Sequence, residues 1–222
     1  MPGCRVRLPQ RAAARYPMFG LLWRSDGHLP ADAWQDAFDK GGQVVLYALG
    51  DRTPSIDDSA YVHPNAVVIG SVKIGPNSSV WPGAVLRGDY GEIAVGARTS
   101  IQDGTVIHAT HDLWTTIGDD CVVGHNAHLE GCVVEDKSLI GSGSVVLHRA
   151  VVRTGALVCA GAVVPNDMEV PSGAMALGVP AKIKLDAVPP GVIQVAVDVY
   201  VENGARYKTD LRRLDEETSA LP

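Results

Sequence analysis

Aliphatic residues recur at every sixth position through most of this chain, and this repeat restricts its possible folds more than any other feature. The series runs from Val62 to Val170, and only a few longer or shorter steps interrupt its phase. Self-similarity at a fixed short period predicts a repeat architecture, in which each unit packs on its neighbours. The repeating positions are Val62, Val68, Ile74, Val80, Leu86, Val95, Ile101, Ile107, Ile117, Val123, Leu129, Val134, Ile140, Val146, Val152, Val158, Val164 and Val170.

Most of these aliphatic residues have a small residue two places before them, as Ala66 precedes Val68 and Ser144 precedes Val146. Residues i and i−2 of a strand point to the same side, so both must face a narrow interior. Segments such as IGPNSS, IGDDCV and IGSGSV place Gly, Asn and Asp between these positions, where they favour turns. The pattern therefore predicts very short strands separated by turns.

This pattern resembles the hexapeptide repeat of the left-handed parallel β-helix proteins. The resemblance implies three six-residue sides per coil and a triangular prism of about six coils. Residues three hexads apart then stack on one face, about 4.8 Å apart. We expect an all-β fold, a left-handed parallel β-helix, with a C-terminal α-helix packed along it.

The chain divides into three expected parts: an N-terminal extension, partly disordered, over residues 1–45, the β-helix over 46–180, and a helix with a tail over 181–222. Residues 1–17 are rich in Arg and lack acidic residues. They fit an organelle transit segment or, as the preferred interpretation, translation from an upstream start codon that was wrongly included. A short helix is expected over 31–39. Pro189 and Pro190 should open the C-terminal helix. Its apolar residues at helical spacing are Val192, Val195, Ala196, Val199 and Tyr200.

Charge and composition exclude several classes of protein. A net charge of −6 argues against nucleic-acid binding. No apolar run approaches the roughly 18 residues of a membrane span, so we expect a soluble, cytoplasmic protein without a membrane partner. The four cysteines include no CxxC pair, which argues against a disulfide scaffold or a cysteine zinc site.

Arg87, His108 and Glu130 each directly follow an inward aliphatic residue, in hexads that stack on one face of successive coils. His108 and Glu130 should therefore lie about one strand spacing apart, close enough to share a metal ion. Asp103 and His125 form a second column on the neighbouring face. His125 cannot easily meet His108 within one chain, but it can in a trimer, so the spacing favours a site between subunits.

The segments VLRGDYGEIAVGARTSIQDGTVIHATH and VGHNAHLEGC resemble the gamma-class carbonic anhydrase family. The resemblance spans roughly residues 46–200 and implies a homotrimer that converts carbon dioxide and bicarbonate at a zinc-type metal between subunits. Three histidines hold that metal in the family. His108, after the QDG turn, matches the first of them, and His125 in the VGH turn matches the second.

The third ligand position of the family is occupied here by Glu130 instead of histidine. Two histidines and one carboxylate form a sound site for Zn²⁺, or for Fe²⁺ or Co²⁺. An anionic ligand offsets part of the ion's field, however, so less bound water should ionise at neutral pH. His128 is the alternative third ligand, although it lies about 6.6 Å along the strand from Glu130.

The resemblance also assigns catalytic roles to Arg87, Asp89, Gln102 and Tyr200. Arg87 and Asp89 match an intersubunit pair near the bound anion, and a guanidinium fork suits the two oxygens of bicarbonate. Without catalysis, the same pair would serve as a salt bridge of the trimer. The residue matching Gln102 orients the metal-bound oxygen in the family. Tyr200 matches a tyrosine that borders the family's site, with core packing as the alternative.

Three functions remain open from the sequence. The first is carbon dioxide hydration, with His111 either a proton shuttle or an ordinary surface histidine. The second is a family member without catalysis, which binds a small ligand or serves assembly. The third is a hexapeptide-repeat acyltransferase. Such enzymes share the LGVPAK-like closing segment, and His111 or His148 could serve as the base.

Overall fold

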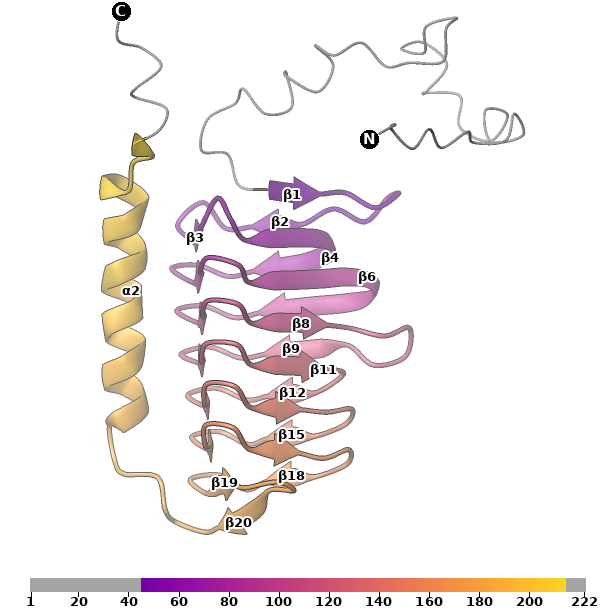
Figure 1. Cartoon of the computed structure of the whole chain (residues 1–222), viewed down its shortest axis with the longest axis vertical. Helices are drawn as coiled ribbons and strands as arrows, with labels where there is room; N and C mark the ends of the chain where they lie inside the picture. The colour runs from indigo at the N-terminus through magenta and orange to yellow at the C-terminus, as the bar shows by residue number, and fades with distance from the viewer. Residues whose placement is uncertain (1–44, 215–222) are drawn as a thin grey trace, which may run out of the picture. The chain divides into compact units, whose positions relative to one another are not determined.

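The computed structural model describes residues 45–214, which wind into a parallel β-solenoid with one helix beside it (Figure 1). The helix expected over 31–39 and the Arg-rich segment 1–17 lie outside these residues. The predicted β-helix with a C-terminal helix is confirmed. No helix in the described range is long and apolar enough to span a membrane.

Three flat faces make up the solenoid, and each consists of strands that pair in parallel with the equivalent strand of the next coil. The first face contains β1 (Val45–Tyr47), the first halves of β4 (Val67–Ile74) and β6 (Val85–Val95), β8 (Val106–His108), β11 (His128–Glu130), β14 (Val145–Val146) and β17 (Val163–Val164). The second face contains β2 (Ser55–Ile56), the second halves of β4 and β6, β9 (Thr115–Ile117), β12 (Val133–Val134), β15 (Val151–Val152) and β18 (Glu169–Val170). β4 and β6 run across the corner between these faces, which joins them into one sheet.

The third face is a separate sheet of β3 (Tyr61–Val62), β5 (Ser79–Val80), β7 (Ser100–Ile101), β10 (Val122–Val123), β13 (Leu139–Ile140), β16 (Leu157–Val158), β19 (Met175–Leu177) and β20 (Lys182–Lys184). The solenoid has about seven coils, one more than predicted. The hexads from Val62 to Val170 make six coils, and three further strands make the seventh. β1 and β2 precede the first hexad at Val62, and the inward residue of β19 is Ala176, which is fully buried but not β-branched. β19 then pairs antiparallel with β20, which ends the solenoid.

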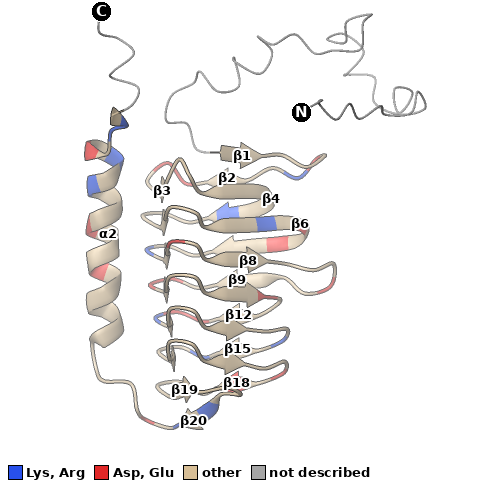
Figure 2. Ribbon diagram, viewed as in Figure 1, with Lys and Arg blue, Asp and Glu red and all other residues tan. Residues whose placement is uncertain are grey.

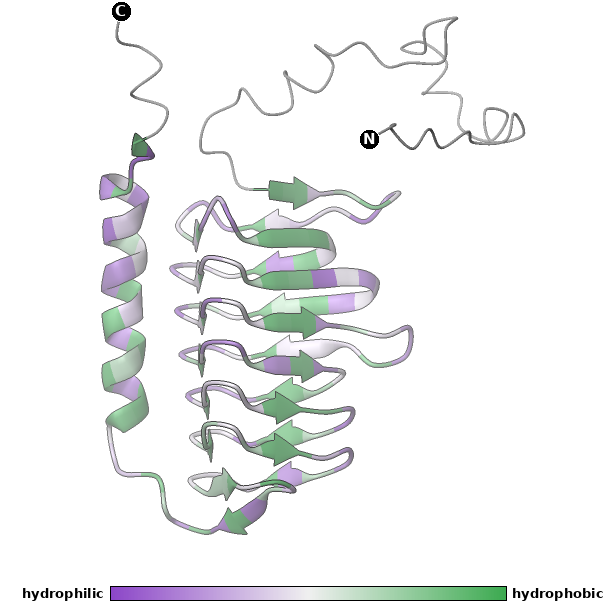
Figure 3. Ribbon diagram, in the orientation of Figure 1, coloured by the Kyte–Doolittle hydropathy of each residue, from purple (hydrophilic) through white to green (hydrophobic). Residues whose placement is uncertain are grey.

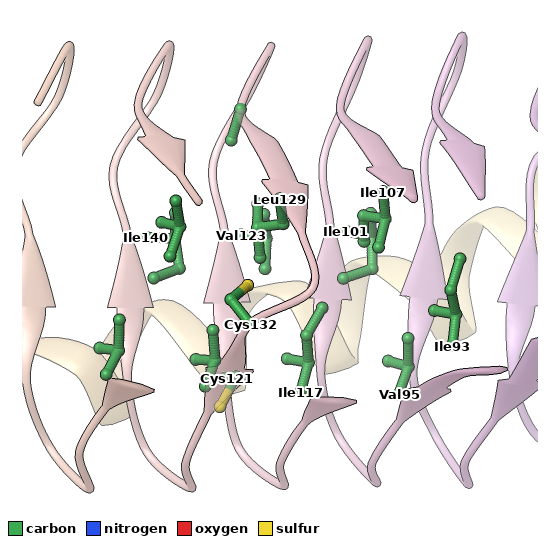
Figure 4. Packing of buried hydrophobic residues seen from close by; sticks show 14 of the residues in the cluster. Ile93, Val95, Ile101, Ile107, Ile117, Cys121, Val123, Leu129, Cys132 and Ile140 are labelled. Carbon is green, nitrogen blue, oxygen red and sulfur yellow. The ribbon is translucent and has the colours of Figure 1, made fainter. Parts of the chain in front are cut away.

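The interior of the prism is filled by the predicted aliphatic residues and by the small residues before them. Ile101, Ile107, Val123 and Leu129 point inward from successive turns of the chain and are fully buried (Figure 4). The small partners at i−2 share this interior: Ala66, Ala84, Thr105, Ala127 and Ser144 are buried. This regular filling fixes which side chains remain on the outside of each strand.

Helix α2 (Val192–Asp210) runs back along the third face and contacts β3, β5, β7 and β10 (Figure 1). It begins after Gly191, slightly later than the two prolines suggested. The predicted apolar face was partly right, because Ala196 and Tyr200 are half-buried and pack against the solenoid. The fully buried residues, however, are Ile193, Val197 and Gly204. Val195, by contrast, is 66% exposed. The amino-terminal half of the helix is hydrophobic around much of its surface, so spacing alone did not identify the packed side (Figure 3).

Candidate functional site

Arg87, His108 and Glu130 lie side by side on the first face, as the hexad positions predicted. Arg87 pairs in register with His108, and His108 pairs in register with Glu130. All three side chains point outward because their neighbours Leu86, Ile107 and Leu129 fill the interior. β6 carries both basic and acidic residues in this region (Figure 2).

The ring of His108 is held between two carboxylates. Its Nδ1 lies 2.6 Å from Glu130 Oε1, and its Nε2 lies 2.9 Å from Asp89 Oδ1. Since carboxylates only accept, a neutral imidazole can satisfy one of these contacts and an imidazolium can satisfy both. His108 must therefore release one carboxylate before it can ligate a metal ion.

Arg87 donates a hydrogen bond to Asp89, which links the guanidinium to the same cluster. Burial alone would raise the pKa of Asp89, but the hydrogen bonds from His108 and Arg87 outweigh it and lower that pKa. The pKa of Glu130 is also below its ordinary value, because His108, His148 and His128 together outweigh the effect of burial. Both carboxylates are thus stabilised in the charged form.

The second oxygen of Glu130 faces two further histidines. His148 Nε2 lies 3.5 Å and His128 Nε2 lies 3.7 Å from Glu130 Oε2. The sequence predicts His128 as an alternative ligand but assigns His148 no role at this site. One signal could have found it: His148 follows Val146, and Val146 pairs in register with Leu129 beside Glu130.

His125 lies away from this cluster, in the turn of residues 124–127 that leads from β10 into β11. Its Nδ1 is 2.9 Å from Asp103 Oδ2, and both side chains are 46% exposed. A carboxylate that accepts the Nδ1 proton fixes the tautomer and leaves Nε2 with a free lone pair. The column of Asp103 and His125 therefore exists, and it presents a ready metal ligand to solvent.

Gln102 and Tyr200 belong to the His125 side of the molecule. Gln102 directly precedes Asp103 and is only 5% exposed. The Tyr200 ring packs edge-on against Trp81, with centroids 5.6 Å apart. Burial and the charge of Asp103 raise the pKa of Tyr200. The candidate residues thus form two half-sites, around His108 and around His125.

The two half-sites occupy opposite edges of the first face. The His125 turn forms the edge shared with the third face, while residues 131–132 after Glu130 lead from β11 into β12 on the second face. His111 lies in the exposed loop of residues 109–114 between β8 and β9. Its ring packs against Tyr90, with centroids 4.9 Å apart.

The donor atoms of this site suit a divalent metal, although one described chain does not complete a centre. Imidazole nitrogens and carboxylate oxygens are the usual ligands of Zn²⁺. Within residues 45–214, no three His, Cys, Asp or Glu side chains form a group that could hold an ion. A buried nitrogen, His148 Nε2, nevertheless has no hydrogen-bond partner next to Glu130. The residues fit a metal to which a second subunit contributes.

Comparison with known proteins identifies the family of the chain. The family model for bacterial transferase hexapeptides (six repeats) matches residues 53–88 and 115–148. Gamma carbonic anhydrase 2, mitochondrial, of Arabidopsis thaliana is 44% identical over 144 residues, which are 62% of this chain and 52% of that protein. Protein YrdA of Escherichia coli (strain K12) is 40% identical over 145 residues, which are 62% of this chain and 79% of YrdA.

Two solved structures share the fold along nearly their whole length. A hexapeptide transferase family protein from Anaplasma phagocytophilum superposes with a TM-score of 0.70 at 36% identity, covering 73% of this chain and 98% of its own. A putative acetyltransferase from Bacillus cereus gives 0.73 at 32% identity, with 75% and 98% covered. This chain spans about half the length of the Arabidopsis relatives. With its hexapeptide repeats and these relatives, the chain belongs to the gamma-class carbonic anhydrase family of hexapeptide-repeat proteins.

Proposed function

We propose that this protein is a homotrimeric carbonic anhydrase that interconverts carbon dioxide and bicarbonate at a metal site between subunits. The observation that carries the proposal is the pair of half-sites at opposite edges of the first face. Each presents a histidine that a neighbouring carboxylate holds in place, at 2.6 Å for His108 and 2.9 Å for His125. A centre assembled from both edges requires at least two copies of the chain.

The surface of the first face supports an assembly of this kind. Its outward positions form a column in register across successive coils: Val67, Val85, Val106, His128, Val145 and Val163. Outward valines on a flat β-face favour burial against another surface. When one edge of a face meets the opposite edge of the next copy, the contact is head-to-tail, and such contacts form a ring when the rotation between copies closes. For a triangular prism, a cyclic trimer fits this geometry.

We assign the metal, Zn²⁺ or else Fe²⁺ or Co²⁺, to His108 and Glu130 of one subunit and His125 of the partner subunit. When bound, such an ion lowers the pKa of a coordinated water towards about 7. Asp103 orients His125 through its Nδ1, as the outer carboxylates of metal sites do. Glu130 brings a negative charge that weakens this acidification, so we expect weak hydration at neutral pH.

The other side chains bind and orient the anion. Arg87 offers its planar guanidinium to two bicarbonate oxygens, and Asp89 holds that guanidinium from the other side. Gln102 is buried next to Asp103 and orients an oxygen at the centre through its amide. Tyr200 borders the site from α2, where its ring is fixed against Trp81. His111 is available for proton transfer to solvent from the neighbouring loop.

Two other functions have a specific observation in their favour. A non-catalytic module for small-ligand binding or assembly fits the loss of the third histidine at Glu130. An acyltransferase fits the names of the two structural neighbours from Bacillus and Anaplasma. Carbonic anhydrase chemistry explains the paired half-sites better than either. A cytoplasmic location stays a prediction.

The first experiment measures metal per chain in the purified trimer by elemental analysis, together with carbon dioxide hydration. About one ion per chain and measurable hydration support the proposal. We expect the substitution Glu130→His to raise hydration at neutral pH, because a neutral imidazole restores the full charge of the ion. A protein that takes up no metal after reconstitution would exclude the proposed reaction and favour the non-catalytic function. Acetyl-CoA that raises the melting temperature would favour the acyltransferase.

A further inference from the structure

We propose that His148 is a metal ligand, and that its Nε2 and Glu130 Oε2 bind the same cation from within one chain. His148 would then supply the imidazole that is missing at position 130. The proposal rests on the proposed metal site and adds a residue to it that neither the hexad pattern nor the family resemblance assigned.

The distance between the two atoms suits co-ligands better than a hydrogen bond. His148 Nε2 and Glu130 Oε2 lie 3.5 Å apart, whereas an N–H···O bond measures about 2.7–3.2 Å. Two atoms bound to a tetrahedral Zn²⁺ at about 2.1 Å are separated by about 3.4 Å. The gap between nitrogen and oxygen is therefore close to the one that a shared ion requires.

The nitrogen itself is buried and has no hydrogen-bond partner, which is uncommon for a polar atom. In residues 45–214 the same holds for just one other buried side-chain atom, the hydroxyl of Tyr61. Leaving a buried polar group unpaired is unfavourable, because its hydrogen bonds to water are lost and not replaced. A cation between His148 and Glu130 would remove this cost, because the nitrogen lone pair would then be used.

The backbone around Glu130 is shaped to admit the His148 ring. Gly131 has a φ of +60°, and a Cβ built there would lie 3.1 Å from His148 Cδ2 and 2.9 Å from Leu113 Cβ. Only glycine leaves this space to the imidazole without strain. Arg149 N–H donates to Gly131 O at 2.7 Å, which fixes the turn that carries His148. The ring is thus held in place before any ion binds.

The neighbouring histidines fit this role less well. His108 already has both ring nitrogens within hydrogen-bond distance of carboxylates, and one of these is the other oxygen of Glu130. His128 lies farther away, at 3.7 Å, and its nitrogen is not among the buried, unpaired atoms. Glu130 Oε2 and His148 Nε2 are therefore a pair that can bind an ion without first breaking a hydrogen bond, whereas His108 must release a carboxylate to join them.

The test is a titration of the full-length, metal-stripped trimer with Co²⁺, followed by calorimetry and by the visible absorption of the bound ion. Loss of a group that merely orients a ligand weakens metal binding by about 10–100-fold. We expect His148→Ala to weaken it by more than that and to change the absorption spectrum. Asp112→Asn, which removes an exposed carboxylate on the nearby loop, should leave the affinity unchanged. His148→Asn provides a second variant if the alanine variant does not fold.

The outcomes separate this inference from the proposed function. If His148→Ala binds Co²⁺ as tightly as the wild type does, the inference is overturned and the proposed interface site remains. A loss of 100-fold or less with an unchanged spectrum would also overturn it, because His148 would then only orient Glu130. If the wild type binds no Co²⁺ at all, both proposals fall. In a Glu130→His background the effect of His148→Ala should shrink, since the third imidazole is restored.

Discussion

At the scale of single residues, the site is a set of charges held by hydrogen bonds on an otherwise apolar face. His108 bridges Asp89 and Glu130, and Arg87 completes the charge balance at Asp89. Removing one partner of such a pair destabilises the folded protein, because the remaining charge stays partly buried without a counter-charge. The cluster is therefore sensitive to the charge of each member.

The lowered pKa of Glu130 predicts how the stability of the metal-free protein depends on pH. A carboxylate whose pKa falls below its ordinary value of 4.5 on folding stabilises the protein above that pH. This stabilisation is lost as the pH drops from 4.5 through the lower pKa of the folded state. Glu130→Gln should therefore be less stable than the wild type at neutral pH and approach it in acid. Urea unfolding at a series of pH values tests this, and parallel curves would contradict it.

Gly131 should tolerate alanine poorly for two separate reasons. A non-glycine residue at positive φ costs about 1–2 kcal/mol, and here the added Cβ also meets Leu113 and His148. Gly143 is a matched control, since its φ is +66° and nothing lies within 4 Å of a built Cβ. We expect Gly131→Ala to lower the free energy of unfolding by more than Gly143→Ala does. Equal losses in chemical denaturation would show that the space beside His148 is not tight.

At the scale of elements, the strands could be predicted because each hexad contains a recognisable inward residue. The C-terminal helix could also be predicted, but not which of its sides packs against the solenoid. Ile193 and Val197 pack against the prism, but the more regular set of Val192, Val195 and Val199 remains largely exposed. The decisive residue is Gly204, which carries no hydrophobic signal. A Cβ there would lie 3.5 Å from Ser79 Cβ and 3.7 Å from Tyr61 Cβ. Close approach of the backbone at Gly204, together with burial of Ile193 and Val197, therefore marks the packed side.

This contact predicts opposite effects for a small and a large residue at position 204. Distances of 3.5–3.7 Å are ordinary contacts, so an alanine fits, and it favours a helix by up to about 1 kcal/mol over glycine. Gly204→Ala should raise the melting temperature. Gly204→Leu should lower it, because the longer side chain must push α2 away from β3 and β5. Thermal unfolding followed by circular dichroism distinguishes the two, and a leucine variant as stable as the wild type would argue against tight packing.

At the scale of the whole molecule, the sequence predicted which polar residues share a face but not which of them touch. The in-register stacking of His108 and Glu130 followed from counting hexads. The contact between His148 and Glu130 was not predicted, because it crosses the corner at Gly131. There the aliphatic repeat shortens to a five-residue step. Contacts made at corners depend on turn geometry, which the period of the repeat does not encode. The seventh coil was missed because β1 and β2 lie before the regular repeat begins at Val62, and because Ala176 in β19 fills the interior without a β-branched side chain.

The proposed trimer makes a prediction with a matched control in the chain itself. Val106 on the first face and Val133 on the second face are both 39% exposed, outward residues of short strands. If the first face is the interface, Val106→Glu places a charge in a buried apolar column, whereas Val133→Glu places the same charge in solvent. Light scattering should therefore find monomers for Val106→Glu and trimers for Val133→Glu. The monomeric variant should also lose Co²⁺ binding, because the half-sites of His108 and His125 no longer meet. If both variants remain trimers, or if only Val133→Glu becomes a monomer, the first face is not the interface. The proposed site would then lose its geometric basis.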